Sequence, residues 1–214
     1  MLPSRIAALL EPFLSRHLAE SRLQDISTYI DILCRWNARI NLTSIREPEE
    51  IVTRHFGESF FAAAHLFPVP SVESKPKVAD LGSGAGFPGL PLKLWAPHIS
   101  LTLIESNHKK AAFLREIARA LTLTDIDIQN DRAESLPPAT FHVVTLRAVE
   151  RFADILPTAA ALVTPGGTMA LLIGSAQVPA ARQAVSTFQW SQPIPIPQSK
   201  SRILLTGRKS DPQV

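Results

Sequence analysis

The chain has 214 residues, of which 45% are hydrophobic and 19% charged, and its net charge is +3. These values exclude a disordered chain and fit one large domain, or a small domain attached to a larger one. The single cysteine excludes an internal disulfide, no apolar run reaches membrane-spanning length, and the N-terminus lacks a secretory pattern, so a cytoplasmic protein with no membrane partner is expected.

The first segment has the pattern of helices, the clearest of which is expected over residues 22–41. One apolar stripe follows helical spacing and is formed by Leu23, Ile26, Ile30, Leu33 and Ile40. Asn37 and Asn41 lie on the same stripe, where a side-chain amide needs hydrogen-bond partners. A C-terminal cap explains Asn41 well and Asn37 poorly, so both are predicted to have assigned partners. Trp36 is interpreted as a core residue, with stacking on a base as the alternative.

A second helical region is expected to begin at Glu47-Pro48, because proline and acidic residues favour a first helical turn. Arg54 and His55 lie near its end, and Gly57 is predicted to stop it before a short apolar helix over 60–66. Prolines and polar residues then form a linker. We therefore divide the chain into a helical cap, residues 1–67, and a larger domain, residues 68–214, which also carries the basic excess that favours polyanionic partners.

From residue 76 the pattern changes to short apolar runs that alternate with helical ones, which is typical of a parallel sheet. Strands are predicted over 77–81, 100–105, 126–130, 143–146 and 167–173, followed by an antiparallel hairpin from 190–196 and 203–207. The clearest helices between them are expected over 108–121, 152–162 and 176–188. Ligands of such sheets bind beyond the carboxyl ends of the strands.

The loop after the first strand carries glycine at alternate positions, Gly82, Gly84 and Gly86. Glycine permits positive φ angles and close approach of the backbone to a ligand. Pro88 and the nearby Pro91 remove N–H donors from the next helical turn, so the loop favours a ligand without phosphates over a dinucleotide. Asp80 before the loop suits a ligand with cationic groups, and S-adenosylmethionine carries both an ammonium and a sulfonium.

The ends of the next two strands complete this cofactor prediction. Glu105 ends the second strand, where a carboxylate accepts hydrogen bonds from ribose hydroxyls. After the third strand, backbone groups near Ala133 and Glu134 are placed to read the edge of an adenine ring. No metal site is predicted.

The end of the fourth strand is informative through what it lacks. Methyltransferases for exocyclic amines usually have Asp/Asn-Pro-Pro-aromatic here, whereas this chain has Thr145-Leu146-Arg147-Ala148. Methylation at carbon 5 of a pyrimidine needs a cysteine nucleophile, and the only cysteine, Cys34, lies in the N-terminal helix. The acceptor is therefore expected to be an atom that is already nucleophilic.

Several motifs together resemble the small-subunit ribosomal RNA methyltransferase G family, also called glucose-inhibited division protein B. They are Trp36-Asn37, Asn41-Leu42-Thr43, Arg54-His55, the run DLGSGAGFPGLP from Asp80 to Pro91, and Arg147-Ala148. The resemblance covers residues 22–207. It implies an α/β class I methyltransferase fold, a Rossmann-like, doubly wound and mostly parallel sheet of seven strands, with an N-terminal helical cap. It also implies methyl transfer from S-adenosylmethionine to N7 of a guanosine in the decoding region of 16S rRNA.

By the same resemblance, the cofactor contacts fall on Gly82, Phe87, Ala133, Glu134 and Arg147, to which the residue-level reading adds Asp80, Gly84 and Glu105. The chain departs from the family where Glu58 replaces a common Asp, where Ile173 replaces a frequent Lys, and where the loop begins Asp-Leu-Gly-Ser instead of Asp-Val-Gly-Thr. The second departure removes a basic contact to RNA or substrate.

Guanine N7 carries a lone pair and no proton, so alignment replaces general-base catalysis. We hypothesise that Asn37 and Asn41 shape the acceptor pocket and that Arg54 and His55 engage O6 or a phosphate. For Arg147, the resemblance favours the methionine carboxylate of the cofactor over RNA.

The expected partner is 16S rRNA, free or within the small subunit, and the protein is expected to be a monomer. Three alternatives stay open: another methyltransferase for a small molecule or RNA, a Rossmann oxidoreductase, and a non-catalytic RNA-binding protein.

Overall fold

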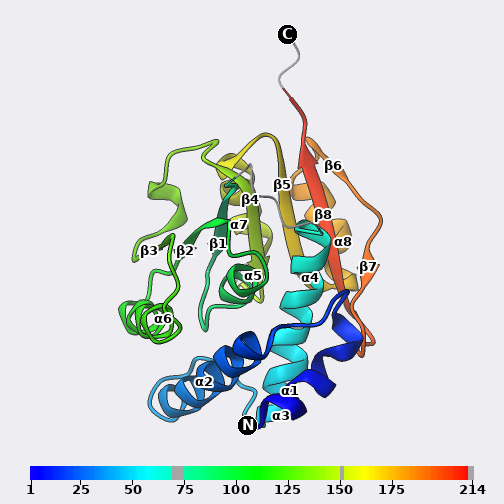
Figure 1. The fold of residues 1–214 in the computed structure, drawn as a ribbon. Helices are drawn as coiled ribbons and strands as arrows, with labels where there is room; N and C mark the ends of the chain where they lie inside the picture. The colour runs from blue at the N-terminus through cyan, green and yellow to red at the C-terminus, as the bar shows by residue number, and fades with distance from the viewer. Residues whose placement is uncertain (69–74, 150–151, 212–214) are drawn as a thin grey trace.

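The computed structural model describes residues 1–68, 75–149 and 152–211 and is built around one twisted sheet (Figure 1). The strand order is β3-β2-β1-β4-β5-β8-β6, and β7 also pairs with β8. The strands are β1 (Lys77–Leu81), β2 (Ser100–Ile104), β3 (Ile126–Gln129), β4 (Phe141–Arg147), β5 (Val163–Gly174), β6 (Phe188–Trp190), β7 (Ile194–Pro195) and β8 (Arg202–Lys209). The first five are parallel, and β8 is antiparallel to its neighbours β5, β6 and β7.

This architecture confirms the predicted class I methyltransferase fold, with one difference at the edge of the sheet. The expected single strand over 190–196 is two short strands, β6 and β7, which both pair with β8, so the sheet has eight strands instead of seven. Pro193 lies in the break between them, and proline cannot donate a ladder hydrogen bond. Strands β4 and β5 extend beyond the predicted ranges.

Helices cover both faces of the sheet. They are α1 (Pro3–Leu10), η1 (Glu11–Phe13), α2 (Glu20–Asn37), α3 (Pro48–Glu50), η2 (Ile51–Gly57), α4 (Glu58–Leu66), α5 (Gly89–Trp95), α6 (His108–Ala120), η3 (Ala133–Ser135), α7 (Phe152–Leu162), η4 (Ser175–Gln177) and α8 (Val178–Ala184). In Figure 1, α4 and α5 lie in front of the sheet, whereas α7 and α8 lie behind it. Successive strand residues point to opposite faces, so Val78 joins the front core and Ala79 the rear core.

The N-terminal helices share the front core with the sheet. Ile26 and Leu33 of α2 belong to the same buried cluster as Leu90 of α5 and Phe113 of α6. Figure 1 shows α1, α2 and α3 gathered at the end of the sheet to which the parallel strands point. The boundary proposed at residue 68 therefore separates chain segments that bury their apolar side chains together. The predicted linker lies mostly outside the described residues.

Three helix predictions are wrong in detail. The helix expected over 176–188 is shorter, because α8 ends at Ala184 and Phe188 begins β6. Helix α2 ends at Asn37, so Ile40 and Asn41 lie in the following loop. Gly57 does not stop the second helix, which passes through the π-helical turn η2 directly into α4. A Cβ atom at Gly57 would lie 2.8 Å from the ring of Phe13, so this glycine permits close packing of η1 instead of ending a helix.

Trp36 has the packing role that the sequence favours. Its ring meets Phe113 edge-on at a centroid distance of 5.8 Å, and its indole N–H donates to Glu116 Oε2 at 3.0 Å. Both partners belong to α6, so Trp36 packs α2 against that helix. Of the described helices, none combines the length and the apolar character needed to cross a bilayer.

Candidate active site

The glycine loop after β1 has the backbone geometry that its sequence predicts. Gly82, Gly84 and Gly86 have φ angles of +68°, +55° and +84°, which side chains other than glycine rarely adopt. A Cβ atom at Gly86 would lie 2.3 Å from the hydroxyl of Tyr29. The loop therefore presents bare backbone at the carboxyl end of β1, the position where a doubly wound sheet binds its ligand.

Asp80 supports this loop from inside the sheet. Its side chain is fully buried, Oδ1 accepts a hydrogen bond from Thr145 Oγ1 at 2.8 Å, and Oδ2 accepts one from the Gly89 amide at 3.2 Å. In this structure neither carboxylate oxygen is exposed, and the effect of the Asp80 charge on a cationic ligand stays a prediction. Asp80 joins β1 to β4 and to the start of α5.

Burial raises the pKa of Asp80 to about 6, although Thr145 and Gly89 partly stabilise its charge. A carboxyl group with a raised folded-state pKa stabilises the fold most when protonated, so this contribution is lost as the pH rises from about 4 to about 6. We expect Asp80→Asn to remove the loss, about 3 kcal/mol at about 1.4 kcal/mol for each pKa unit. Urea unfolding of both proteins across this pH range measures the difference, and parallel pH profiles would contradict the assignment.

Glu105 lies directly after β2 and faces the glycine loop. Its Oε2 accepts from the Gly84 amide at 2.9 Å, its Oε1 accepts from the Asn107 amide at 2.8 Å, and its backbone oxygen accepts from Asn130 Nδ2 at 2.8 Å. These bonds fix the carboxylate between the loop and the start of α6. A carboxylate has further lone pairs, so this orientation suits the predicted ribose contact.

The loop after β3 also lies at this edge. Ala133 is buried at the start of η3, whereas Glu134 is exposed. Asn130 connects this loop to Glu105, so the predicted adenine and ribose positions are adjacent.

Tyr29, the only tyrosine of the chain, is a site residue that the sequence reading missed. Its hydroxyl donates to the Ala85 carbonyl at 2.6 Å, and its ring stacks on Phe87 at 5.3 Å between centroids. Phe87 in turn stacks on His55 at 4.7 Å. Three aromatic rings from α2, the glycine loop and η2 therefore form one stack. The sequence signal for this role was a single tyrosine among the apolar residues of the helix.

Tyr29→Phe should loosen the glycine loop, because the buried Ala85 carbonyl would lose its donor while the ring stack stays in place. An unsatisfied buried acceptor costs about 1–3 kcal/mol, so we expect the unfolding free energy to fall by that amount and the affinity for S-adenosylmethionine to fall several-fold. Urea unfolding and calorimetry measure the two effects. Gln24→Ala, an exposed change on the same helix, should alter neither quantity.

Asn37 has the assigned partners that were expected, but they are backbone groups. Its Oδ1 accepts from the amides of Leu42 and Thr43 at 2.9 and 3.1 Å, and its Nδ2 donates to the Thr43 carbonyl at 2.9 Å. With its amide bonded in this way, Asn37 holds the loop after α2, and its place in the acceptor pocket stays a prediction. Asn41 is exposed on that loop.

A chain of hydrogen bonds connects the same loop to the end of β4. Arg147 Nη1 donates to His55 Nδ1 at 2.8 Å, so the ring proton of His55 is on Nε2, which donates to Thr43 Oγ1 at 2.8 Å. Burial, followed by the positive charges of Arg147 and Arg54, lowers the pKa of His55 to about 2. His55 is therefore neutral, and both of its ring nitrogens are occupied.

Arg147 is anchored almost entirely by residues of the N-terminal segment. Its Nη2 donates to the Arg54 carbonyl at 2.8 Å and lies 3.3 Å from Glu58 Oε2. Arg54 itself donates from Nε to Glu58 Oε1 at 3.0 Å. The motif Arg54-His55 and the motif at Arg147, 92 residues apart from His55 along the chain, thus form one polar cluster.

The chain matches the family described as rRNA small subunit methyltransferase G over residues 22–201. It is 39% identical over 175 residues to ribosomal RNA small subunit methyltransferase G of Stenotrophomonas maltophilia strain K279a, covering 81% of this chain and 79% of that protein. The protein of the same name from Roseiflexus castenholzii is 38% identical over 207 residues, covering 91% and 86%.

This chain belongs to the rRNA small subunit methyltransferase G family. The resemblance seen in its motifs is thereby confirmed.

Solved structures agree with the fold of this family member. The magnesium protoporphyrin IX methyltransferase of Synechocystis superposes with a TM-score of 0.64 at 14% identity, covering 87% of this chain and 97% of that one. A predicted O-methyltransferase from Agrobacterium tumefaciens gives a TM-score of 0.58 at 23% identity, covering 72% and 81%. At these identities the likeness shows the class I methyltransferase fold.

The departure from the family pattern at Ile173 is explained by burial. Ile173 is buried near the end of β5, pairs with Ile203 of β8 and packs in the rear core. An apolar side chain suits this position, and the basic contact that the family often has is absent from it.

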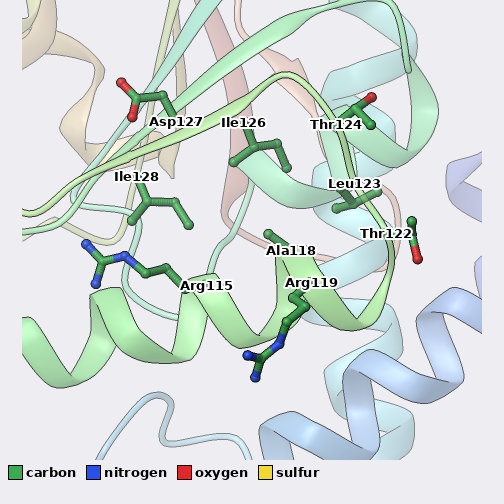
Figure 2. Close-up of a pocket in the computed structure, with 9 residues that line it drawn as sticks. All are labelled: Arg115, Ala118, Arg119, Thr122, Leu123, Thr124, Ile126, Asp127 and Ile128. Atoms are coloured by element: carbon green, nitrogen blue, oxygen red, sulfur yellow. The ribbon is translucent and has the colours of Figure 1, made fainter.

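A groove of about 540 Å³ lies away from the glycine loop, between α6 and the edge strand β3. Its lining includes Arg115 and Arg119 (Figure 2). In Figure 2, Arg115 reaches toward Ile128 whereas Arg119 turns away from the strand. A binding site normally has polar groups that converge, so we assign no ligand to this groove.

Proposed function

We propose that this member of the methyltransferase G family transfers a methyl group from S-adenosylmethionine to N7 of a guanosine in 16S rRNA. The observation that carries the proposal is the loop from Gly82 to Gly86, whose positive φ angles expose backbone at the end of β1 and whose Gly84 amide is tied to Glu105. A strand, a glycine loop and a ribose-directed carboxylate fit an adenosyl cofactor.

Different residues of the chain would contact different parts of the cofactor. The backbone of Gly82 and Gly84 with the ring of Phe87 would hold its centre, and Glu105 would accept hydrogen bonds from the ribose hydroxyls. Backbone groups at Ala133 and Glu134 would meet the adenine edge, and Arg147 the methionine carboxylate. When bound, the cofactor supplies a methyl group on a sulfonium that is open to nucleophilic attack.

The polar groups at the site support an acceptor that needs no general base. His55 is the only imidazole in the described cluster, and its two ring nitrogens are engaged by Arg147 and Thr43. Its pKa near 2 also leaves it without affinity for a proton at neutral pH. The protein would therefore act by orienting the N7 lone pair toward the methyl group, an effect of proximity and alignment.

For the acceptor side we propose a division of roles among the predicted residues. Asn41 and Arg54 have accessible side chains and are the residues we assign to the acceptor nucleotide or its phosphate. Asn37 and His55 would act indirectly as positioning residues. Asn37 fixes the loop that carries Asn41, and His55 orients Arg147. Such a protein would act as a monomer on the small ribosomal subunit in the cytoplasm.

The test is mass mapping of 7-methylguanosine in 16S rRNA from a strain that lacks the gene, with complementation. The modification should disappear from one guanosine and return with the wild-type gene. Persistence of the modification would contradict the proposal. Transfer to a small molecule without RNA, NAD binding, or RNA binding without turnover would favour the respective alternatives.

A further inference from the structure

Three arginines from distant parts of the chain surround one buried carboxylate, Glu58. Arg54 Nε lies 3.0 Å from Oε1, while Arg202 Nη2 and Arg147 Nη2 lie 3.1 and 3.3 Å from Oε2. Arg202 also donates to the Leu172 carbonyl at 3.0 Å, which places it at the end of β5. The cluster therefore lies at the carboxyl edge of the sheet, on the side of β4 away from the glycine loop.

Within this cluster, three positive charges face one negative charge. Glu58 is 1% exposed and fully committed to its partners, and the neutral His55 adds no charge. The side chains of Arg147, Arg202 and Arg54 are 8%, 19% and 42% exposed, so they form a gradient from the interior to the surface. Charge that is shielded from water is costly unless an opposite charge compensates it. An anion at the exposed edge of the cluster would offset its excess of positive charge.

Unused hydrogen-bonding capacity points to the same conclusion. In the described part of the chain, the only buried side-chain nitrogen or oxygen atoms without a partner are Nε of Arg147 and Nε of Arg202. These two arginines, but not Arg54, also line a small hollow of about 30 Å³ beyond the ends of β4 and β5. A hollow of that size admits one or two oxygen atoms, so it suits one oxygen atom of an anion that binds at Arg202.

We propose that Arg54 and Arg202, held in place by Glu58, bind a phosphate group of the RNA backbone next to the acceptor nucleotide. The inference rests on the proposed function, which supplies an RNA substrate and assigns Arg147, the innermost guanidinium, to the carboxylate of the cofactor. Guanidinium groups bind phosphate oxygens through paired, charge-assisted hydrogen bonds. Glu58 orients both outer arginines by occupying one face of each, and the phosphate takes the outward face.

Two anions could bind to these arginines, the carboxylate of the cofactor and a phosphate of the RNA. Inorganic phosphate, added when the cofactor is already bound, distinguishes the two. We would follow the thermal unfolding of the full chain with saturating S-adenosylmethionine, adding phosphate against sodium chloride of equal ionic strength. Phosphate should still raise the unfolding temperature, because the cofactor occupies only Arg147. A phosphate effect that disappears once the cofactor is bound would mean that the cluster serves the carboxylate alone, and would overturn the proposal.

Arg202→Gln is the decisive variant, with Arg182→Gln as its matched control. Arg182 lies on α8 and donates to the Ser191 carbonyl, away from the cluster. In Arg202→Gln the phosphate effect should be lost and the KM for ribosomal subunits should rise about tenfold, a typical loss for one charged hydrogen bond. The Kd for S-adenosylmethionine should be unchanged, and Arg182→Gln should behave as wild type.

If Arg202→Gln does not fold, Arg54→Gln takes its place, because that side chain is nearly half exposed. The phosphate site would be refuted if the wild type transfers methyl groups and a folded variant keeps both the wild-type KM and the wild-type phosphate effect. Failure of the wild-type protein to methylate any 16S rRNA guanosine would instead refute the proposed function.

Discussion

Gly86→Ala should reduce the affinity for S-adenosylmethionine by about 100-fold. The new Cβ atom would lie 2.3 Å from Tyr29 Oη and 2.6 Å from Leu90 Cδ1, at a residue with a φ angle of +84°. The positive φ costs about 1–2 kcal/mol and overpacking about 1–3 kcal/mol. Because the loop would move to relieve both, only a small fraction of molecules would keep the binding geometry, and the apparent Kd would rise in proportion. Isothermal titration with the cofactor measures this loss.

Gly84→Ala is the matched control for steric crowding. Gly84 also has a positive φ, +55°, but the nearest atom to its Cβ position is 3.7 Å away. Within the protein itself this variant bears only the conformational cost, so its affinity should fall by at least about tenfold. Equal losses in the two variants would show that backbone strain, and not contact with Tyr29, sets the geometry of the loop.

Arg147→Gln should weaken cofactor binding by about 10-fold to 150-fold. The substitution removes the innermost guanidinium, and a hydrogen bond to a charged group contributes about 1.5–3 kcal/mol. Glu58 would keep Arg54 and Arg202 as partners, so the cluster should stay folded. Calorimetry with S-adenosylmethionine measures the affinity, and urea unfolding checks the fold.

Arg202→Gln supplies the comparison for Arg147→Gln, because it removes a guanidinium from the same carboxylate. We expect its cofactor affinity to match that of the wild type. An unaltered affinity in Arg147→Gln would place Arg147 on the RNA, and equal losses in both variants would indicate a general effect of charge.

Local patterns predicted most of the parallel sheet and the cofactor loop. Alternating apolar runs and helical periods depend on neighbouring residues, and positive φ angles at Gly82, Gly84 and Gly86 follow from the lack of a side chain. The helix that contains Arg54 was wrongly predicted to end at Gly57, because glycine usually interrupts a helix. Here the missing side chain of Gly57 makes room for the ring of Phe13. Only the position of η1 in space reveals that contact.

The polar residues show the limit of the same reasoning. Asn37 was recognised as unusual on an apolar stripe, but sequence spacing did not reveal that its partners are the backbone groups of Leu42 and Thr43. Asp80 was placed correctly before the loop, but the sequence did not reveal that it is buried and bonded to Thr145, so that it connects β1 to β4. Arg202 gave no signal in the sequence, because nothing near it in the chain belongs to the cluster that it joins.

The sequence by itself determined the family and the strand–loop–helix unit at Gly82 to Gly86, and it predicted the sites at the ends of β2 and β4. Each of these depends on residue types at short spacings, and such patterns can be recognised without knowledge of the tertiary structure. Only the tertiary structure decided which side chains face outward. Burial and pairing are properties of segments brought together from far apart, as Glu58 and Arg202 are, 144 residues apart in the chain.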